Sequence, residues 1–138
     1  MDKYFIPEIS DLHVEYECER NMYIVGEYDK DISKRWMRWV IEDGSDIINI
    51  IRESKNDNIR VPYLTQEQIE AEGWNNTTLD YQKIMLFVGE KVQGYYYKLV
   101  YNYWNHRLSI TEVDDSCLFS GECKSINELR YICKLLKI

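Results

Sequence analysis

The chain of 138 residues has little proline and glycine, with two prolines and six glycines. Flexible linkers between domains are usually rich in such residues, so the sequence offers no point at which to divide the chain. A chain of this length also fits one hydrophobic core and leaves no room for two independent ones. We therefore predict a single domain that spans residues 1–138.

Long apolar segments are absent too. The longest apolar runs, such as residues 84–88, are far shorter than the roughly 20 residues that cross a bilayer as a helix. The N-terminus has neither the apolar stretch nor the small-residue cleavage site of a signal peptide. We expect the protein to remain in the cytoplasm of the cell that makes it and to have no membrane partner.

Residues that would support catalysis are few and scattered. The only histidines, His13 and His106, have no serine, cysteine or aspartate at the spacing of a nucleophilic triad. The four cysteines lack the paired C-x-x-C pattern of a zinc site, and there is no glycine-rich phosphate loop. We interpret the cysteines as small core residues, because disulfides are rare in the cytoplasm. The sequence therefore predicts a protein that is not an enzyme and uses no cofactor.

Positive charge is in deficit, with 17 basic against 24 acidic residues and a net charge of −7. A negative protein is poorly suited to general binding of nucleic acid or of an anionic membrane. The charge is compatible with a basic protein partner, although the need for solubility explains it equally well.

Alternation of apolar and polar residues over 12–19 predicts a strand with one buried face. Its other face carries Glu15, Glu17 and Glu19, spaced by about 6.7 Å because each residue rises ~3.3 Å. We expect this row to be solvated. It could also imitate a nucleic-acid backbone or supply a pair of hydrolytic carboxylates, but catalysis would require burial to raise a pKa.

Several more elements follow from local patterns. A tight turn at 20–21 would lead to a second strand, and the segment 33–41 fits a strand better than a helix, although its spacing allows either. One short helical turn is expected at 46–51 and a loop at 75–78. Pro62 would restrict its strand to a sheet edge or a strand end. The remaining predicted strands cover residues 22–28, 59–63, 83–88, 95–103, 108–113 and 117–122.

Two helices have recognisable starts. Thr65 with Gln68, and Ser125 with Glu128, have the spacing of capping boxes. Short turns between the later strands indicate antiparallel neighbours. The predicted fold class is α+β, with antiparallel β-meander sheets packed against a C-terminal helix and a short middle helix.

Aromatic and arginine side chains are interleaved at Arg35, Trp36, Arg38 and Trp39. Such groups can stack on unpaired bases, and the same residue types dominate protein–protein hot spots. Burial of both tryptophans in the core would explain them equally well. An exposed tryptophan would favour a protein partner over RNA, because the chain is acidic.

Tyrosine is concentrated between residues 95 and 103. The odd-numbered positions share one strand face, and we predict that they pack beneath the C-terminal helix. Tyr96 on the other face and Trp104 beyond the strand are predicted contact residues, since aromatic side chains provide contact area at low entropic cost.

Three groups of residues are candidates for features shared with a family: residues 6–17, residues 59–64 with Ile69 and Gly73-Trp74, and residues 119–121 with 127–129. On these residues the whole chain resembles small uncharacterised proteins from phages and prophages of Bacteroidota. Pro62 and the tryptophan and arginine content of 35–39 depart from that group. The resemblance transfers no functional residues. It implies a mobile-element protein in the cytoplasm of a bacterial host cell. That class includes anti-CRISPR inhibitors, and an RNA-targeting type VI effector is the expected target.

The favoured hypothesis is an anti-CRISPR inhibitor that binds a basic, nucleic-acid-processing protein, namely an RNA-guided nuclease, and blocks guide or target engagement. The alternative is a single-stranded nucleic-acid-binding accessory protein of a phage, and a small hydrolase using Glu15 and Glu17 ranks last. The predicted partner-binding residues are Glu15, Glu17, Glu19, Arg35, Trp36, Arg38, Trp39, Tyr96 and Trp104.

Overall fold

The computed structural model describes residues 3–21, 36–54, 59–77, 80–84 and 96–138. The chain divides into two compact units, Met1–Tyr63 and Leu64–Ile138. Each unit has its own cluster of buried apolar side chains, where the chain length led us to expect one core. The prediction of a single domain over residues 1–138 stays a prediction.

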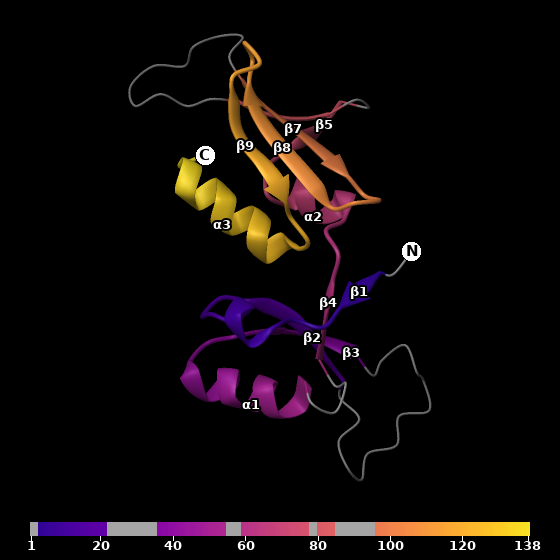
Figure 1. The fold of residues 1–138 in the computed structure, drawn as a ribbon, viewed down its shortest axis with the longest axis vertical. Helices are drawn as coiled ribbons and strands as arrows, with labels where there is room; N and C mark the ends of the chain where they lie inside the picture. The colour runs from indigo at the N-terminus through magenta and orange to yellow at the C-terminus, as the bar shows by residue number, and fades with distance from the viewer. Residues whose placement is uncertain (1–2, 22–35, 55–58, 78–79, 85–95) are drawn as a thin grey trace. The chain divides into compact units, whose positions relative to one another are not determined.

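The first unit is a four-stranded sheet with one helix (Figure 1). Its strand order is β1-β4-β2-β3, and every described pairing is antiparallel. A short 3-10 helix, η1, covers Ile9–Asp11. The strands are β1 (Tyr4–Phe5), β2 (Glu17–Asn21), β3 (Trp36–Val40) and β4 (Ile59–Pro62), and the helix is α1 (Gly44–Ser54).

The helix α1 packs against one face of this sheet. Ile50 of the helix is fully buried with Cys18 of β2 and with Ile59 and Val61 of β4, and Ile47 packs against the same cluster. Because side chains alternate along a strand, the residues between these positions point to the other face. That second face carries Glu17 and Glu19 of β2 and Arg60 of β4.

The strand predicted over residues 12–19 has different limits in the structure. It begins only at Glu17 and runs through residues 20–21, which we had predicted as a turn. Glu15 has a φ of 75°, and its N–H donates to the Ile41 carbonyl at 2.8 Å, so the chain turns there. Val14 is consequently 52% exposed, not part of a buried strand face.

Other predictions for this unit fare better. The segment 33–41, described from residue 36 onward, is a strand at Trp36–Val40, as favoured. Pro62 ends its strand as expected. The short turn predicted at 46–51 is a longer helix that continues to Ser54, and the strand predicted at 22–28 lies outside the described residues.

Asp43 fixes the start of α1. Its Oδ1 accepts hydrogen bonds from the Ser45 hydroxyl at 2.6 Å, from the Ser45 N–H at 2.9 Å and from the Asp46 N–H at 3.1 Å. These bonds favour the charged carboxylate, and the one from the Ser45 side chain contributes most to lowering the pKa of Asp43. The first turn of the helix is thereby supplied with an acceptor.

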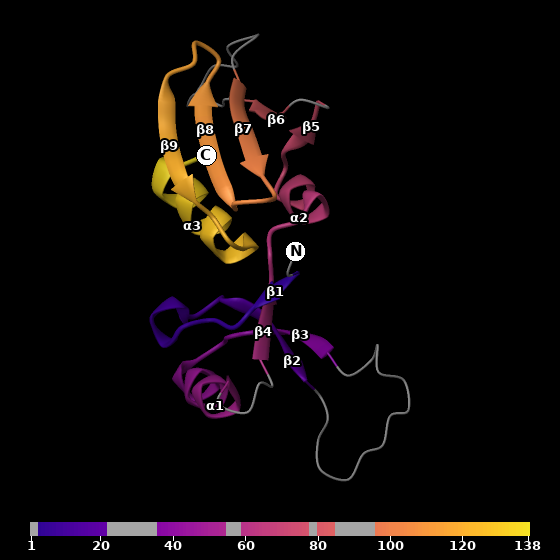
Figure 2. The same cartoon turned by 45° about the vertical axis from the view of Figure 1, so that its right-hand side comes forward.

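The second unit is a five-stranded antiparallel meander with two helices (Figure 2). Its strands lie side by side in the order of the chain. In the described parts of both units, no helix has the length and apolar character needed to cross a membrane. The elements are α2 (Gln66–Ala71), β5 (Asn75–Asn76), β6 (Tyr81–Ile84), β7 (Tyr96–Asn102), β8 (Arg107–Glu112), β9 (Cys117–Glu122) and α3 (Ile126–Leu136).

This arrangement confirms the α+β class, the meander, the short middle helix and the C-terminal helix. The later strands lie close to their predicted limits. The loop predicted at 75–78 contains β5, and β6 begins two residues before the predicted strand, whose remainder is not described.

The core of the second unit lies between the sheet and its helices. Leu99, Ile110 and Leu129 have no exposed surface. Tyr97, Leu99, Tyr101 and Tyr103 belong to this cluster, which confirms the predicted packing of the described odd-numbered positions. The Tyr103 hydroxyl is 2.6 Å from that of Tyr81, and burial is the main cause of a raised pKa for Tyr103.

Gly121 has a specific packing role in β9. A Cβ placed there would lie 3.1 Å from Cζ of Phe119, two residues earlier on the same strand face. The phenyl ring therefore occupies the space that a side chain at residue 121 would need.

The two predicted capping boxes differ in outcome. At α2 the Thr65 hydroxyl accepts from the Gln68 N–H at 3.3 Å, and the Gln68 side chain accepts from the Thr65 N–H at 3.2 Å. At α3 the prediction is wrong, because Ser125 makes no side-chain cap bond and is buried. The Glu128 carboxylate instead accepts from the N–H of Lys124.

Candidate binding surface

Six side chains of the first unit gather on the sheet face opposite α1. The register explains the grouping, because Glu19 lies directly opposite Arg38 on one side and Arg60 on the other. Residues that pair directly, or that lie two apart along a strand, share a face. We call this surface the Arg60 face, and it consists of Tyr4, Glu17, Glu19, Trp36, Arg38 and Arg60.

Arg60 is held between two aromatic rings. Its Cζ lies 3.6 Å from the centroid of the Tyr4 ring and 4.0 Å from that of the Trp36 ring. Its Nε donates to Glu19 Oε1 at 2.9 Å, and its terminal nitrogen is 2.9 Å from the same oxygen. A planar guanidinium suits such stacking and forked hydrogen bonding. The side chain is therefore fixed in position by residues from the three other strands of the sheet.

The carboxylates of this face are paired with arginines. Glu17 accepts a hydrogen bond from Nε of Arg38, and Glu19 accepts those from Arg60. The side chains of Glu17 and Glu19 are only 12% and 23% exposed, so the expected row of solvated acids is wrong. Glu15 is exposed but lies in the turn before β2, outside the row. Two acids and two arginines leave the face without excess charge, which removes the basis for imitating a nucleic-acid backbone.

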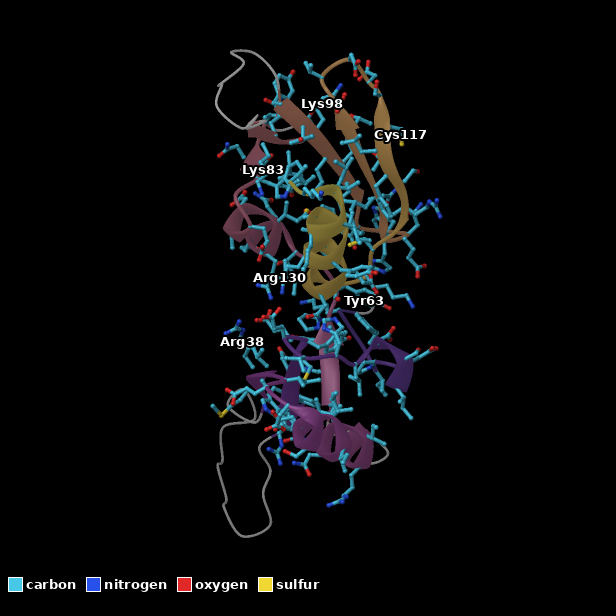
Figure 3. All side chains as sticks on the ribbon, turned by 90° about the vertical axis from the view of Figure 1, so that its left-hand side faces the viewer. Arg38, Tyr63, Lys83, Lys98, Cys117 and Arg130 are labelled. Carbon is cyan, nitrogen blue, oxygen red and sulfur yellow. The ribbon has the colours of Figure 1, made fainter. Side chains whose placement is uncertain are left out.

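The tryptophan and arginine segment is divided between the two faces of β3. Trp36 and Arg38 belong to the Arg60 face, whereas Trp39 packs against the core cluster with the Arg20 guanidinium 4.7 Å from its ring centroid. Arg38 is the most accessible member, with 68% of its side chain exposed (Figure 3). Arg35 lies outside the described residues. Strand alternation thus separates residues that are adjacent in sequence.

The other two predicted contact residues belong to the second unit. Tyr96 is half-buried at the start of β7, on the strand face that also carries exposed Val100. Trp104 is 82% exposed in the turn between β7 and β8. The side-chain oxygen of Asn102 accepts from the Trp104 N–H at 2.9 Å and so orders this turn. Trp104 is the most exposed of the large apolar side chains described.

Sequence reasoning missed Tyr4 and Arg60. Arg60 lies 41 residues from its partner Glu19, and no local pattern connects the two. The alternation of Ile59, Arg60 and Val61 does place the arginine on a non-core face. Its role depends on which strands pair, and local sequence does not specify that.

The described residues contain no group of three or more histidine, cysteine, aspartate or glutamate side chains that could hold a metal ion. Cys18 and Cys123 are buried as expected, but Cys117 is exposed on β9. Burial raises the pKa of the Cys123 and Cys133 thiols, which disfavours the reactive thiolate.

Comparison of the chain with protein-family models, curated protein sequences and solved structures gives no match. Function is therefore inferred from the residues themselves, and the Arg60 face is the best-defined surface for that purpose.

Proposed function

We propose that the protein is a phage or mobile-element inhibitor that acts by binding, with an RNA-guided nuclease of the bacterial host as its target. Binding would block engagement of the guide or target nucleic acid. The observation that supports a binding role is the Arg60 face, where Tyr4 and Trp36 enclose a guanidinium on the sheet surface opposite the helix.

This surface has the composition of an interface hot spot. Tryptophan, tyrosine and arginine are the residue types that contribute most to binding energy in protein–protein contacts. Because the rings and guanidinium already hold one another in place, binding would cost little additional side-chain entropy. Arg38, at the exposed margin, can pair with an acceptor on the partner.

A nucleic-acid-processing protein is the proposed partner because the whole chain carries a net charge of −7. Such a charge would speed the encounter with a basic surface. The attraction would come from the molecule as a whole, since the acids of the Arg60 face are paired with arginines. The choice of a type VI effector rests on the resemblance to phage and prophage proteins.

Direct binding of single-stranded nucleic acid has less support. Stacking on Trp36 would suit an unpaired base, but the face has no excess positive charge with which to hold the phosphates.

The proposal can be tested with purified type VI effector, its guide RNA and a labelled target RNA. The wild-type chain should bind the effector and suppress cleavage. Replacing Trp36 and Arg38 together by alanine should weaken binding by about tenfold or more, because hot-spot truncations typically cost over 1.4 kcal/mol.

Met37→Ala is the matched control, because Met37 is an exposed neighbour on the opposite face of β3. It should leave binding and inhibition unchanged. Wild-type protein that neither binds nor inhibits the effector would disprove the nuclease target, whereas a low-salt gel shift of single-stranded RNA would identify the alternative function.

A further inference from the structure

The outer edge of the second unit carries features of an interface that the Arg60 face does not use. We propose that a second copy of this chain binds there, with β9 of one copy alongside β9 of the other and their α3 helices in contact. This inference is independent of the nuclease and of the Arg60 face.

The first feature is an edge strand suited to pairing. β9 is the outermost strand of the meander and pairs with β8 alone among the described strands. The Cys123 N–H donates to the His106 carbonyl at 2.7 Å. Because bonding alternates along an antiparallel strand, Gly121 and Phe119 also bond toward β8, and Ser120 and Glu122 direct their backbone groups outward. The strand contains no proline and one charged residue, so little prevents another strand from pairing with it.

The second feature is an apolar hollow beside this strand. It has a volume of about 290 Å³ and lies between β9 and α3, which Figure 2 shows next to each other. Tyr131 and Leu135 on its helix side are 60% and 63% exposed, which is unusual for large apolar side chains that lie together. The lining residues are Phe119, Glu122, Glu128, Tyr131, Ile132, Leu135 and Leu136.

The third feature is the division of charge around α3. Arg130 and Lys134 line a different hollow, of about 220 Å³, together with Lys83 and Glu72. Figure 3 shows Lys83 and Arg130 on the side of α3 away from Cys117 of β9. The basic flank of the helix is thus directed away from the β9 edge, and the flank beside the edge is apolar with a single carboxylate, Glu128.

These features select a second copy over a foreign strand. A two-fold axis that pairs β9 antiparallel with its symmetry mate also places α3 against α3. Tyr131 and Leu135 of each copy can then fill the hollow of the other. Glu122 is the last residue of β9 and Glu128 lies in the first turn of α3, so both acids lie at one end of the contact. The antiparallel arrangement sends the acids of the two copies to opposite ends, and like charges do not meet. A foreign strand would cover the edge but supply no helix for the exposed tyrosine and leucine.

The test is sedimentation equilibrium of the full chain over a range of concentrations. The mass should rise from the 16.7 kDa of one chain toward twice that value. Ser120→Pro removes an outward N–H without affecting the bonds to β8, and Leu135→Glu places a charge in the apolar contact. Each substitution should weaken the dimer by about tenfold or more.

Lys134→Glu is the matched control, because it changes the charge of an exposed neighbour on the other flank of α3. It should leave the dissociation constant within about twofold, as expected for a site outside the contact. Ser120 and Leu135 are both exposed, so circular dichroism should show all three variants folded. A chain that stays monomeric at every concentration overturns the proposal. That result would hold even if a strand from another protein binds the β9 edge. A dimer that tolerates both Ser120→Pro and Leu135→Glu, or one that Lys134→Glu disrupts equally, overturns the proposal as well.

Discussion

At the scale of single residues, Arg60 links more of the first unit than any neighbour on its face. Its guanidinium contacts Tyr4 of β1, Glu19 of β2 and Trp36 of β3, while its backbone belongs to β4. One side chain therefore connects all four strands. A lysine retains the charge but has no planar group to place between two rings.

Arg60→Lys should lower the free energy of unfolding by about 1–2 kcal/mol, because lysine loses the planar stacking between the two rings and the forked bond to Glu19. Urea denaturation followed by tryptophan fluorescence measures the change. Arg52→Lys, an exposed substitution on α1, is the control and should alter stability by less than about 0.5 kcal/mol. Equal effects of the two substitutions would show that the stacked arrangement contributes nothing.

The residue scale is also where sequence reasoning was least complete. It named Trp36, Arg38 and Trp104 as contact residues, because tryptophan and arginine are conspicuous in any sequence, but left open whether Trp36 was buried in the core. It treated Glu17 and Glu19 as solvated, since the alternation of β2 gives no information about its neighbours. Their arginine partners come from β3 and β4, at separations of 21 and 41 residues.

At the scale of elements, α1 depends on its first turn. Folding lowers the pKa of Asp43 below its ordinary value of 3.8, chiefly through the Ser45 hydroxyl. A carboxylate with a lowered pKa stabilises the fold above its unfolded pKa, and this contribution is lost as the pH falls through the folded pKa. The window of loss therefore lies below pH 3.8.

Asp43→Asn should reduce this acid sensitivity, because asparagine also caps a helix but does not titrate. The measurement is the urea midpoint at pH 7 and at about pH 3. The decrease in midpoint between the two conditions should be smaller for the variant than for the wild type. An identical decrease in both proteins would mean that the cap does not couple folding to protonation.

The elements also show why one unit was easier to predict. Strands β7, β8 and β9 are joined by short turns, so local turn residues fix both their limits and their pairing. In the first unit β4 lies between β1 and β2, although it follows both in the chain. The turn at Glu15 has a positive φ without a glycine, so the sequence gives no sign of it. The predicted capping box of α3 is wrong because Ser125 is buried, and its spacing to Glu128 in the sequence does not show that burial.

At the scale of the whole molecule, the two buried clusters raise the question of cooperativity. Each compact unit contains one cluster and two of the four tryptophans. Leu129→Ala would create a cavity in the second unit, where Leu129 has no exposed surface. Such a change typically costs about 2–5 kcal/mol.

Leu129→Ala should therefore speed amide hydrogen exchange in β7, β8 and β9 far more than in β2 and β4. Exchange measured by mass spectrometry on peptides from each unit distinguishes the two. Equal acceleration in both units would instead establish the single cooperative domain that the chain length predicts.

The contact between Phe119 and Gly121 constrains how this molecule can change over evolutionary time. A phenylalanine ring that occupies the space of a missing side chain makes the two positions epistatic. A larger residue at 121 requires the Phe119 ring to move by a few tenths of an ångström or to be replaced by a smaller side chain. The order of the two substitutions therefore affects the stability of the intermediate. Related chains should accordingly lose this glycine and this phenylalanine together.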